Sequence, residues 1–382
     1  MDFELDKELT FLKEMVRDLV QEKIDPRATE IDEKDEFPWD IKEALVEHEI
    51  LAMPFSEEYG GTGGKVLPLV VAIEEIAKVS ASVAMILSGQ CLGSAAISIA
   101  GTEEQKQRFL PELASGEKLC AYALTEPNAS LDEGDFQSTA VIDGNEYVIN
   151  GSKRFIVLGN IADIITVFAK TTDEKTGEKK LSCFVVEKGK GLVVRKLEHK
   201  MGVKGMPMAE LFFDNMRVPK ENLLGAEGDG LTIAMQVLDK CRLVVAAQSV
   251  GIAQGALDFA VQYSRDRVQF GSPIGKFQAV QMIFGDMEIK TQAARYLTYV
   301  AADKYDRKAH DRSKYSAMAK AFASDTAMYV TTEAIQIMGG YGYVKEYPVE
   351  RMFRDAKMQQ IYEGTNEIQR INIARSLLGS GF

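Results

Sequence analysis

The sequence predicts an α+β protein, mainly α, in which two helical regions flank a smaller β-region. At both ends of the chain, apolar residues recur every three or four positions, which is the period of an amphipathic helix. Between these ends the period shortens to two and turn residues become frequent, which favours strands. We therefore expect an N-terminal helical domain over residues 1–118, a middle antiparallel β-domain over 119–228 and a C-terminal four-helix bundle over 229–382.

Several helices are expected before residue 119. The first follows an apolar stripe at positions 5, 9, 12, 16 and 19, and others cover residues 41–49 and 103–110. Residues 67–99 are long enough for two helices, and we expect the break between them near Gly89 or Gly93.

The middle and C-terminal regions differ in pattern. A turn at Asp143-Gly144 between residues 138–142 and 147–150 predicts a hairpin, and further strands are expected over 164–169, 182–187, 192–197 and 210–213. After Gly228 the helical period returns, and long helices are expected over 231–261, 274–301 and 313–338.

Length and charge exclude several classes of protein. A chain of 382 residues fits two or three domains, and a net charge of −12 disfavours binding to a nucleic-acid backbone. No uninterrupted apolar run reaches the roughly 18–20 residues that span a bilayer. The acidic N-terminus matches neither a signal peptide nor a transit peptide. We expect a cytoplasmic protein that binds no nucleic acid and inserts into no membrane.

Generic motifs point to no site. Residues 59–65 resemble a phosphate loop, but Val66 stands where that loop needs a hydroxyl, so a turn is the better interpretation. Gly339 and Gly340 follow a helix and are expected to end it. The four cysteines and three histidines are scattered, which predicts free thiols and no metal site.

The most specific motifs lie near the C-terminus. Residues 336–343 are followed by 360–370, which contain the run Tyr-Glu-Gly-Thr. With residues 122–127, 150–153 and 267–271, these segments resemble the acyl-CoA dehydrogenase family over the whole chain. The resemblance implies the three-domain order that the periodicity predicts, and it implies a homotetramer.

The resemblance implies an FAD-dependent enzyme that removes two hydrogens across the Cα–Cβ bond of an acyl-CoA thioester. Such a reaction needs a positioned base, donors at the enolate oxygen and a cofactor that accepts hydride. Glu363 matches the family's base, and apolar surroundings would raise the pKa of its carboxyl. The implied enolate donors are the backbone N–H of Glu363 and a ribityl hydroxyl of FAD.

The family pattern also implies how FAD is held. The residues expected around the flavin ring are Tyr122, Leu124, Thr125, Phe155 and Val157. Those expected to reach the ADP half of FAD in a neighbouring subunit are Arg267, Phe270, Gln278, Gln336 and Gly340, and further contacts are implied for Thr365 and Glu367. Without the resemblance, Phe155 fits a core position equally well, and Arg267 fits a surface ion pair better.

The acyl-CoA is expected to lie beside the base. The residues implied to bind it are Ser130, Leu131, Asp239, Arg242, Tyr362 and Gly364. Some relatives place the base just before the counterpart of Arg242, but here that position is Cys241, a poor substitute. A few relatives that act on cyclic substrates use an aspartate at or near the place of Cys91, so this thiol favours ordinary α,β-desaturation.

The chain departs from the family pattern near the flavin. Residues 129–132 replace an Ala-Gly-Ser-Asp run, which moves or removes a hydroxyl near the phosphates. Val157 replaces a threonine that hydrogen-bonds to flavin N5, and Leu158 replaces a common asparagine. These departures, and a likeness to anaerobic bacterial members, favour a short, branched or alicyclic acyl group such as cyclohexane-1-carbonyl-CoA.

Two alternative functions stay open at this point. An acyl-CoA oxidase would use the same fold and base but pass its electrons to oxygen, although such enzymes are usually longer. A non-catalytic CoA-binding relative is disfavoured because Glu363, Arg267 and Phe270 are retained. For a dehydrogenase, the implied electron acceptor is an electron-transferring flavoprotein.

Overall fold

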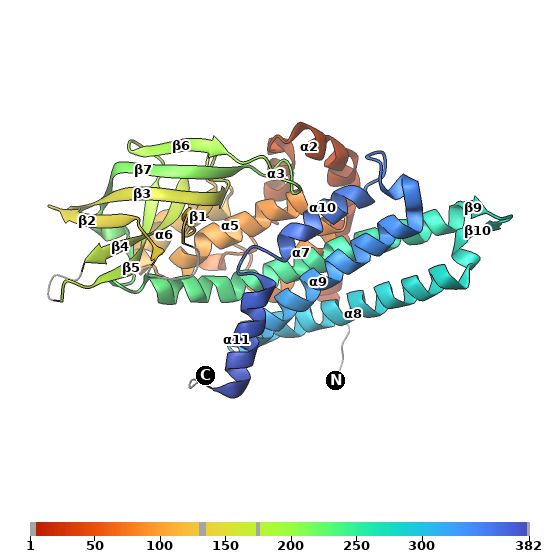
Figure 1. Cartoon of the computed structure of the whole chain (residues 1–382). Helices are drawn as coiled ribbons and strands as arrows, with labels where there is room; N and C mark the ends of the chain where they lie inside the picture. Colours follow the sequence, from red (N-terminus) through yellow and green to blue (C-terminus); the bar gives the residue numbers. More distant parts are fainter. Residues whose placement is uncertain (1–4, 130–134, 173–175, 380–382) are drawn as a thin grey trace.

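A computed structural model describes residues 5–129, 135–172 and 176–379 of the chain. Figure 1 shows a β-sheet at one end, the N-terminal helices beside it, and long C-terminal helices that extend to the other end. The predicted order of a helical, a β and a second helical part is confirmed.

Helices form the N-terminal part. Asp6 caps the first of them by accepting the Leu9 N–H at 2.8 Å, and Thr102 and Gln105 form a capping box at the last. The helices are α1 (Lys7–Leu19), α2 (Ala28–Lys34), α3 (Trp39–Glu47), α4 (Val66–Ala77), α5 (Ala81–Ala100) and α6 (Glu103–Ala114). Short π or 3-10 turns lie at Val20–Ile24, Asp25–Arg27 and Glu57–Tyr59.

The break between α4 and α5 lies at residues 78–80, so the prediction of a break near Gly89 or Gly93 is wrong. Ser80 caps the N-terminus of α5 with its hydroxyl. Gly93 lies inside α5 because the helix touches the sheet there: a Cβ at this position would lie 2.7 Å from the carbonyl carbon of Cys120. The glycine therefore permits a close approach of two backbones and does not end the helix.

The middle part is one sheet, which has eight strands within the described residues, in the order β6-β7-β3-β2-β4-β5-β8 with β1 beside β4. The predicted hairpin at Asp143-Gly144 is confirmed, and most neighbouring strands are antiparallel as predicted. However, β1 and β4 run parallel, because the whole β2–β3 hairpin connects them. The strands are β1 (Cys120–Ala123), β2 (Thr139–Asp143), β3 (Glu146–Val157), β4 (Ile164–Thr172), β5 (Lys179–Glu187), β6 (Leu192–Leu197), β7 (Met208–Pro219) and β8 (Leu223–Leu224).

Long helices form the C-terminal part, and Gly339 ends one of them with a φ of 60°, as predicted. The N-terminal helices α4 and α5 also pack against this part, and Arg295 of α8 forms a 2.8 Å ion pair with Glu74 of α4. The helices are α7 (Gly230–Asp266), α8 (Gln278–Asp306), α9 (Arg312–Met338), α10 (Val349–Gln359) and α11 (Asn366–Leu378). A small hairpin of β9 (Val268–Gln269) and β10 (Ser272–Pro273) joins α7 to α8.

Helices α5 and α7 are long and apolar enough, by length and composition, to cross a membrane. In each helix, 78% of the most apolar window is nevertheless buried inside the fold, and the two helices pack against each other. Their apolar character is that of core helices.

We expect Gly93→Ala to destabilise the protein, because the new Cβ would collide with the backbone of Cys120. Overpacking of this kind costs about 1–3 kcal/mol, which corresponds to a fall of several degrees in Tm. The matched control is Ser98→Ala on the same helix, measured by the same thermal melt. Equal melting temperatures for the two variants would contradict the close contact between α5 and β1.

Candidate active site

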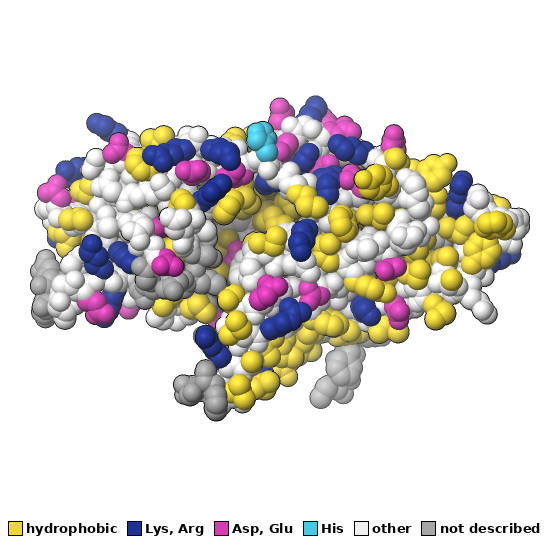
Figure 2. Space-filling model, in the orientation of Figure 1, with side chains coloured by type: hydrophobic (Ala, Val, Ile, Leu, Met, Phe, Trp, Pro, Cys, Tyr) yellow, Lys and Arg dark blue, Asp and Glu magenta, His cyan; other side chains and the backbone are white. Residues whose placement is uncertain are grey.

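A cavity of about 860 Å³ lies where the β-sheet, α5, α7 and the segment between α10 and α11 meet. Figure 2 shows hydrophobic side chains gathered in the hollow between the sheet and α10. The residues predicted from the sequence that line the cavity are Tyr122, Leu124, Thr125, Phe155, Val157, Tyr362, Glu363, Gly364 and Thr365. Segments that are far apart in the sequence are thus brought to one mainly apolar space.

Glu363 lies in the short segment between α10 and α11, in an unusual backbone conformation. Its φ is 56° and that of Gly364 is 89°, so two consecutive residues occupy the left-handed region. A residue with a side chain is uncommon there and is retained only when its surroundings hold it in place. The turn directs the carboxyl of Glu363 into the cavity, where Oε2 is buried and has no hydrogen-bond partner within the described residues.

Three side chains hold this turn by its backbone carbonyls. Arg242 of α7 donates from Nε to the carbonyl of Glu363 at 3.3 Å, and Lys320 of α9 donates to the carbonyl of Gly364 at 2.9 Å. Gln369 of α11 donates to both carbonyls, at 3.3 Å and 2.9 Å. The carboxyl of Glu363 itself stays free for chemistry.

Lys320 is also part of a buried polar cluster at the start of α11. Its Nζ donates to Oδ1 of Asn366 at 2.9 Å, and Nδ2 of Asn366 donates to Ser324 and Asp325, at 2.8 Å each. Lys320 and Ser324 are fully buried. Lys320, Ser324 and Asp325 all belong to α9, whereas Asn366 begins α11. Because Lys320 bonds to both Gly364 and Asn366, the position of the turn depends on α9 as well as on α11.

The electrostatic surroundings of Glu363 favour a carboxyl that gains and loses a proton near neutrality. Burial raises its pKa to about 7, while the cations of Arg242 and Lys320 act in the opposite direction. Burial also lowers the pKa of Lys320 to about 8, and the charge of Glu363 opposes that effect. The predicted rise in the pKa of this glutamate is confirmed.

A buried ion pair fixes the part of the cavity wall that contains Leu124 and Thr125. Lys153 of β3 lies 2.7 Å from Glu126 and donates to the carbonyl of Leu124 at 2.8 Å. The Arg154 N–H donates to the carbonyl of Thr125 at 2.8 Å. Since the Lys153 and Glu126 side chains are both buried, loss of one partner would leave the other charge uncompensated.

Phe155 lies in the cavity wall and leaves 52% of its surface exposed, with a φ of 60°. The core position that was the alternative for this ring is therefore wrong, because the backbone turns the side chain out of the sheet. Val157 also lines the cavity, and Leu158 is fully buried behind it, against Gly89 of α5. Val157 and the buried Leu158 thus stand at this edge of the cavity in the places where the resemblance implies a hydroxyl and an amide.

A chain of polar side chains lies along one wall of the cavity. The Tyr362 hydroxyl donates to Oε1 of Gln248 at 2.6 Å, and Nε2 of Gln248 donates to Ser88 of α5 at 2.9 Å. Gln248 is one turn beyond Val244 and Val245, which line the cavity with Ser88 and Tyr362. These three side chains form a hydrogen-bonded wall between α5 and α7.

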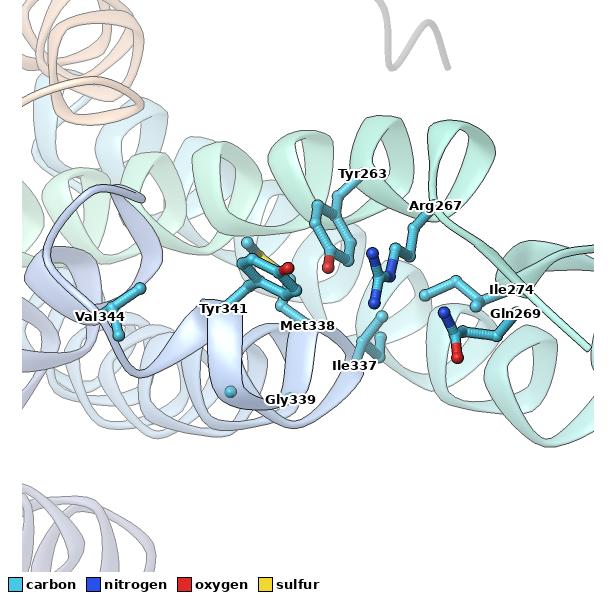
Figure 3. Close-up of a pocket in the computed structure, with 10 residues that line it drawn as sticks. Tyr263, Arg267, Gln269, Ile274, Ile337, Met338, Gly339, Tyr341 and Val344 are labelled. Carbon is cyan, nitrogen blue, oxygen red and sulfur yellow. The ribbon is translucent and has the colours of Figure 1, made fainter.

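A second pocket of about 480 Å³ lies near the far end of the bundle (Figure 3). Arg267 and Gly340, both predicted from the sequence, line it together with Gln269 and Tyr341. The guanidinium of Arg267 lies 5.0 Å from the centre of the Tyr341 ring. Among the described residues it forms no ion pair, so the surface ion pair that was its alternative is not found there. The pocket is therefore lined by the cationic side chain of Arg267 and by the exposed backbone of Gly339 and Gly340.

The other predicted site residues that the structure describes lie outside both pockets. Gln278 and Gln336 are exposed on α8 and α9, Glu367 is exposed at the start of α11, and Phe270 is 95% exposed on the β9–β10 hairpin. Asp239 forms a 2.9 Å ion pair with Arg242, which holds the turn at Glu363. Ser130 and Leu131 lie outside the described residues.

Several residues at the site were not predicted from the sequence. Lys320 and Gln248 act through partners that are distant in the chain, so no local motif marks them. Asn366 and Gln369 lie within the motif of residues 360–370, but the motif did not indicate which groups they hold. One signal was present: Lys320 stands alone in an alanine-rich stretch of helix, where a charged residue needs a buried partner.

The chain matches three domains described for one family. These are the acyl-CoA dehydrogenase N-terminal domain over residues 6–117, the middle domain over 121–216 and the C-terminal domain over 228–378. The chain belongs to the acyl-CoA dehydrogenase family. This membership confirms the resemblance found in the motifs.

Similar proteins cover the whole chain. A cyclohex-1-ene-1-carbonyl-CoA dehydrogenase of Geobacter metallireducens is 48% identical and covers 98% of this chain and 99% of its own. The structure of butyryl-CoA dehydrogenase from Megasphaera elsdenii is 44% identical, with a TM-score of 0.95 and coverage of 99% and 100%. A chain in the structure described as the electron transferring flavoprotein of Acidaminococcus fermentans is 45% identical, with a TM-score of 0.96 and full coverage of both chains.

We expect Lys320→Met to shift the pH dependence of acyl-CoA turnover. The Lys320 cation lowers the pKa of Glu363, so its removal raises that pKa further above the ordinary range. Because the base acts in its ionised form, the rising limb of the rate profile should move to higher pH. Lys320→Arg, which keeps the charge, should restore most of the original profile. An unmoved limb in Lys320→Met would show that the lysine does not influence the carboxyl.

Proposed function

We propose that the protein is an FAD-dependent acyl-CoA dehydrogenase that converts an acyl-CoA to its 2-enoyl-CoA. One observation supports this proposal above the others: the carboxyl of Glu363 faces an apolar cavity and has a pKa raised to about 7. A base with that pKa is half ionised at neutral pH and is strong enough to assist removal of a weakly acidic α-proton.

The cavity wall is chemically suited to a flavin. Phe155 offers an exposed ring, and the Tyr122 hydroxyl is buried without a partner within the described residues, ready for a hydrogen bond. Leu124 and Thr125 present a wall fixed by the Lys153–Glu126 pair. When bound, FAD supplies the acceptor for the hydride that leaves Cβ.

The residues of the chain then have distinct roles. Glu363 takes the α-proton on its unpartnered oxygen, and its backbone N–H donates to the thioester oxygen where negative charge develops. Arg242, Lys320 and Gln369 hold the turn and so fix the distance between base and substrate. The apolar lining excludes water from the carboxyl, which keeps its pKa high.

We expect Glu363→Gln to abolish bleaching of the bound flavin by an acyl-CoA while FAD stays bound. Loss of a general base lowers such rates by at least about 10²-fold. The control is Glu346→Gln, an exposed glutamate before α10, which should bleach at the original rate. Bleaching at an undiminished rate in Glu363→Gln, followed by stopped-flow absorbance, would remove the glutamate from the mechanism.

The substrate is proposed to carry a short, branched or alicyclic acyl group. We propose that the hydrogen-bonded wall of Ser88, Gln248 and Tyr362, one helical turn beyond Val244, limits the length of the acyl chain. Of the relatives, one is named for a butyryl substrate and another for an alicyclic one.

We expect Gln248→Ala to shift the preference toward longer acyl chains, because the wall between α5 and α7 would be opened. The ratio of kcat/KM for octanoyl-CoA over butyryl-CoA should rise at least about tenfold, the effect of a few buried methylene groups. Gln262→Ala, an exposed position on the same helix, should leave the ratio unchanged. An unaltered ratio in a folded, FAD-loaded Gln248→Ala enzyme would place the end of the acyl chain elsewhere.

A homotetramer is also proposed. One stripe of α8 exposes three apolar side chains, those of Met282, Ile289 and Val300. In a monomer these side chains would be exposed to water, whereas a neighbouring subunit would cover them. A neighbouring copy on this face would bring a second chain near Arg267 and Phe270, in agreement with the cross-subunit contacts to FAD that the family pattern implies.

We propose a cytoplasmic location and an electron-transferring flavoprotein as the electron acceptor. The choice of acceptor is supported by the similarity of this chain to a chain in the structure described as an electron transferring flavoprotein. An acyl-CoA oxidase would instead form hydrogen peroxide during turnover in air, so a peroxide assay separates the two activities.

A further inference from the structure

A buried ion pair connects two of the sequence motifs beside the catalytic cavity. Glu126 belongs to the segment after β1, and Lys153 belongs to β3. Their side chains are 3% and 0% exposed, and Nζ of Lys153 lies 2.7 Å from Oε1 of Glu126. A buried pair of this kind is often no more stable than two packed apolar side chains, so its charges point to a role other than stability.

The carboxylate of Glu126 is held on both of its oxygens. Besides Lys153, the N–H of Gln137 donates to Oε2 at 2.6 Å, and the N–H of Ser138 donates to Oε1 at 3.1 Å. Burial opposes the charge of Glu126, but Lys153 and these two donors outweigh burial and lower the pKa of the carboxyl. Burial lowers the pKa of Lys153 to about 8, and the charge of Glu126 opposes that effect. The lysine is therefore largely a cation at neutral pH.

Lys153 also binds the wall of the cavity. Its Nζ donates to the carbonyl of Leu124 at 2.8 Å, and the N–H of Arg154 donates to the carbonyl of Thr125 at 2.8 Å. Leu124 and Thr125 both line the cavity. Since β3 binds the two carbonyls of this segment, these acceptors are already occupied when a ligand enters.

The peptide bond between Leu124 and Thr125 links the lysine to the cavity. A trans peptide is planar, so the N–H of Thr125 points away from the carbonyl that Lys153 binds. Within the described residues, this N–H donates to no protein group. A cation that binds the carbonyl polarises the amide, and the N–H of the same amide becomes a stronger donor. Glu126 balances the charge of Lys153 but does not bind this peptide.

We propose that Lys153 is a positioning residue for the flavin, which strengthens the Thr125 N–H as a donor to the cofactor and thereby favours flavin reduction. This inference rests on the proposed function, because it requires FAD in the cavity. Two-electron reduction adds negative charge to a flavin, and hydrogen bonds and charges near its ring are the means by which a protein tunes its potential. The lysine acts through one peptide and needs no contact of its own with the cofactor.

The test replaces both charges, Lys153→Met together with Glu126→Gln. No lone charge is left buried, and Gln keeps an oxygen for the N–H groups of Gln137 and Ser138. The potential of the bound FAD is measured by titration with dithionite against a reference dye. We expect the equilibrium constant for flavin reduction to fall at least tenfold, which is about 30 mV for a two-electron couple. A variant that releases FAD is titrated with oxidised and reduced FAD in turn, since the ratio of the two Kd values reports the same equilibrium.

The matched control is a buried ion pair elsewhere, between Arg295 of α8 and Glu74 of α4. Neither residue is among the described residues that line the cavity. Arg295→Met together with Glu74→Gln should lower Tm but leave the flavin potential unchanged. A milder variant, Lys153→Gln together with Glu126→Gln, offers a neutral donor and should shift the potential in the same direction by a smaller amount.

The outcomes separate this proposal from the proposed function. An equilibrium constant that is unchanged or higher after Lys153→Met with Glu126→Gln would overturn the role of Lys153, as would an equal shift in the control pair. Bleaching of the original protein by an acyl-CoA would then leave the proposed function standing. If the potentials shift as expected but no acyl-CoA bleaches the original FAD-loaded protein, the proposed function fails and the role of Lys153 stands.

Discussion

The structure depends on one constraint: a glutamate must be held beside a dry cavity without use of its carboxyl as an anchor. The fold meets this constraint through the backbone. The carbonyls of Glu363 and Gly364 accept donors from Arg242, Lys320 and Gln369, which come from three different helices. These bonds offset a left-handed backbone that a residue with a side chain adopts only under restraint. The carboxyl is left with an unpartnered oxygen for the substrate.

Burial raises the pKa of the Glu363 carboxyl, and two of these donors, Arg242 and Lys320, act in the opposite direction. Burial alone would keep the Glu363 carboxyl neutral, and direct pairing with a cation would make it a weak base. Arg242 and Lys320 give a pKa between these two extremes. They hydrogen-bond to the backbone of the turn and not to the carboxyl, while their charges still lower its pKa. A pKa of about 7 therefore depends on the packing of α7 and α9 against the turn, and not on any single contact.

The sequence alone was sufficient for the elements whose signals are local. Apolar periodicity placed the long helices, and a turn dipeptide placed the β2–β3 hairpin. Prediction from the sequence failed where one residue type can serve two purposes. Gly93 was expected to end a helix, but it lies inside α5 and allows that helix to touch the sheet. The break between α4 and α5 instead precedes Ser80, which caps α5. The parallel pairing of β1 with β4 is non-local and left no local pattern. Glu363 was found through a motif, but Lys320 is meaningful only when α9 lies beside the turn.

The apolar edge of the cavity shows how a departure from the family pattern is absorbed by the fold. Leu158 has a φ of 61° and is fully buried, and a Cβ on Gly89 would lie 3.1 Å from its Cδ1. The leucine thus occupies the space that the missing side chain of Gly89 leaves on α5. Val157, which lines the cavity, and Leu158 behind it therefore place apolar side chains at the edge expected to face the flavin. Since an unpaired polar group in a dry site is costly, the two apolar replacements are consistent with each other and with an apolar substrate. The apolar edge of the cavity is therefore built on the contact between α5 and the end of β3, away from Glu363 itself.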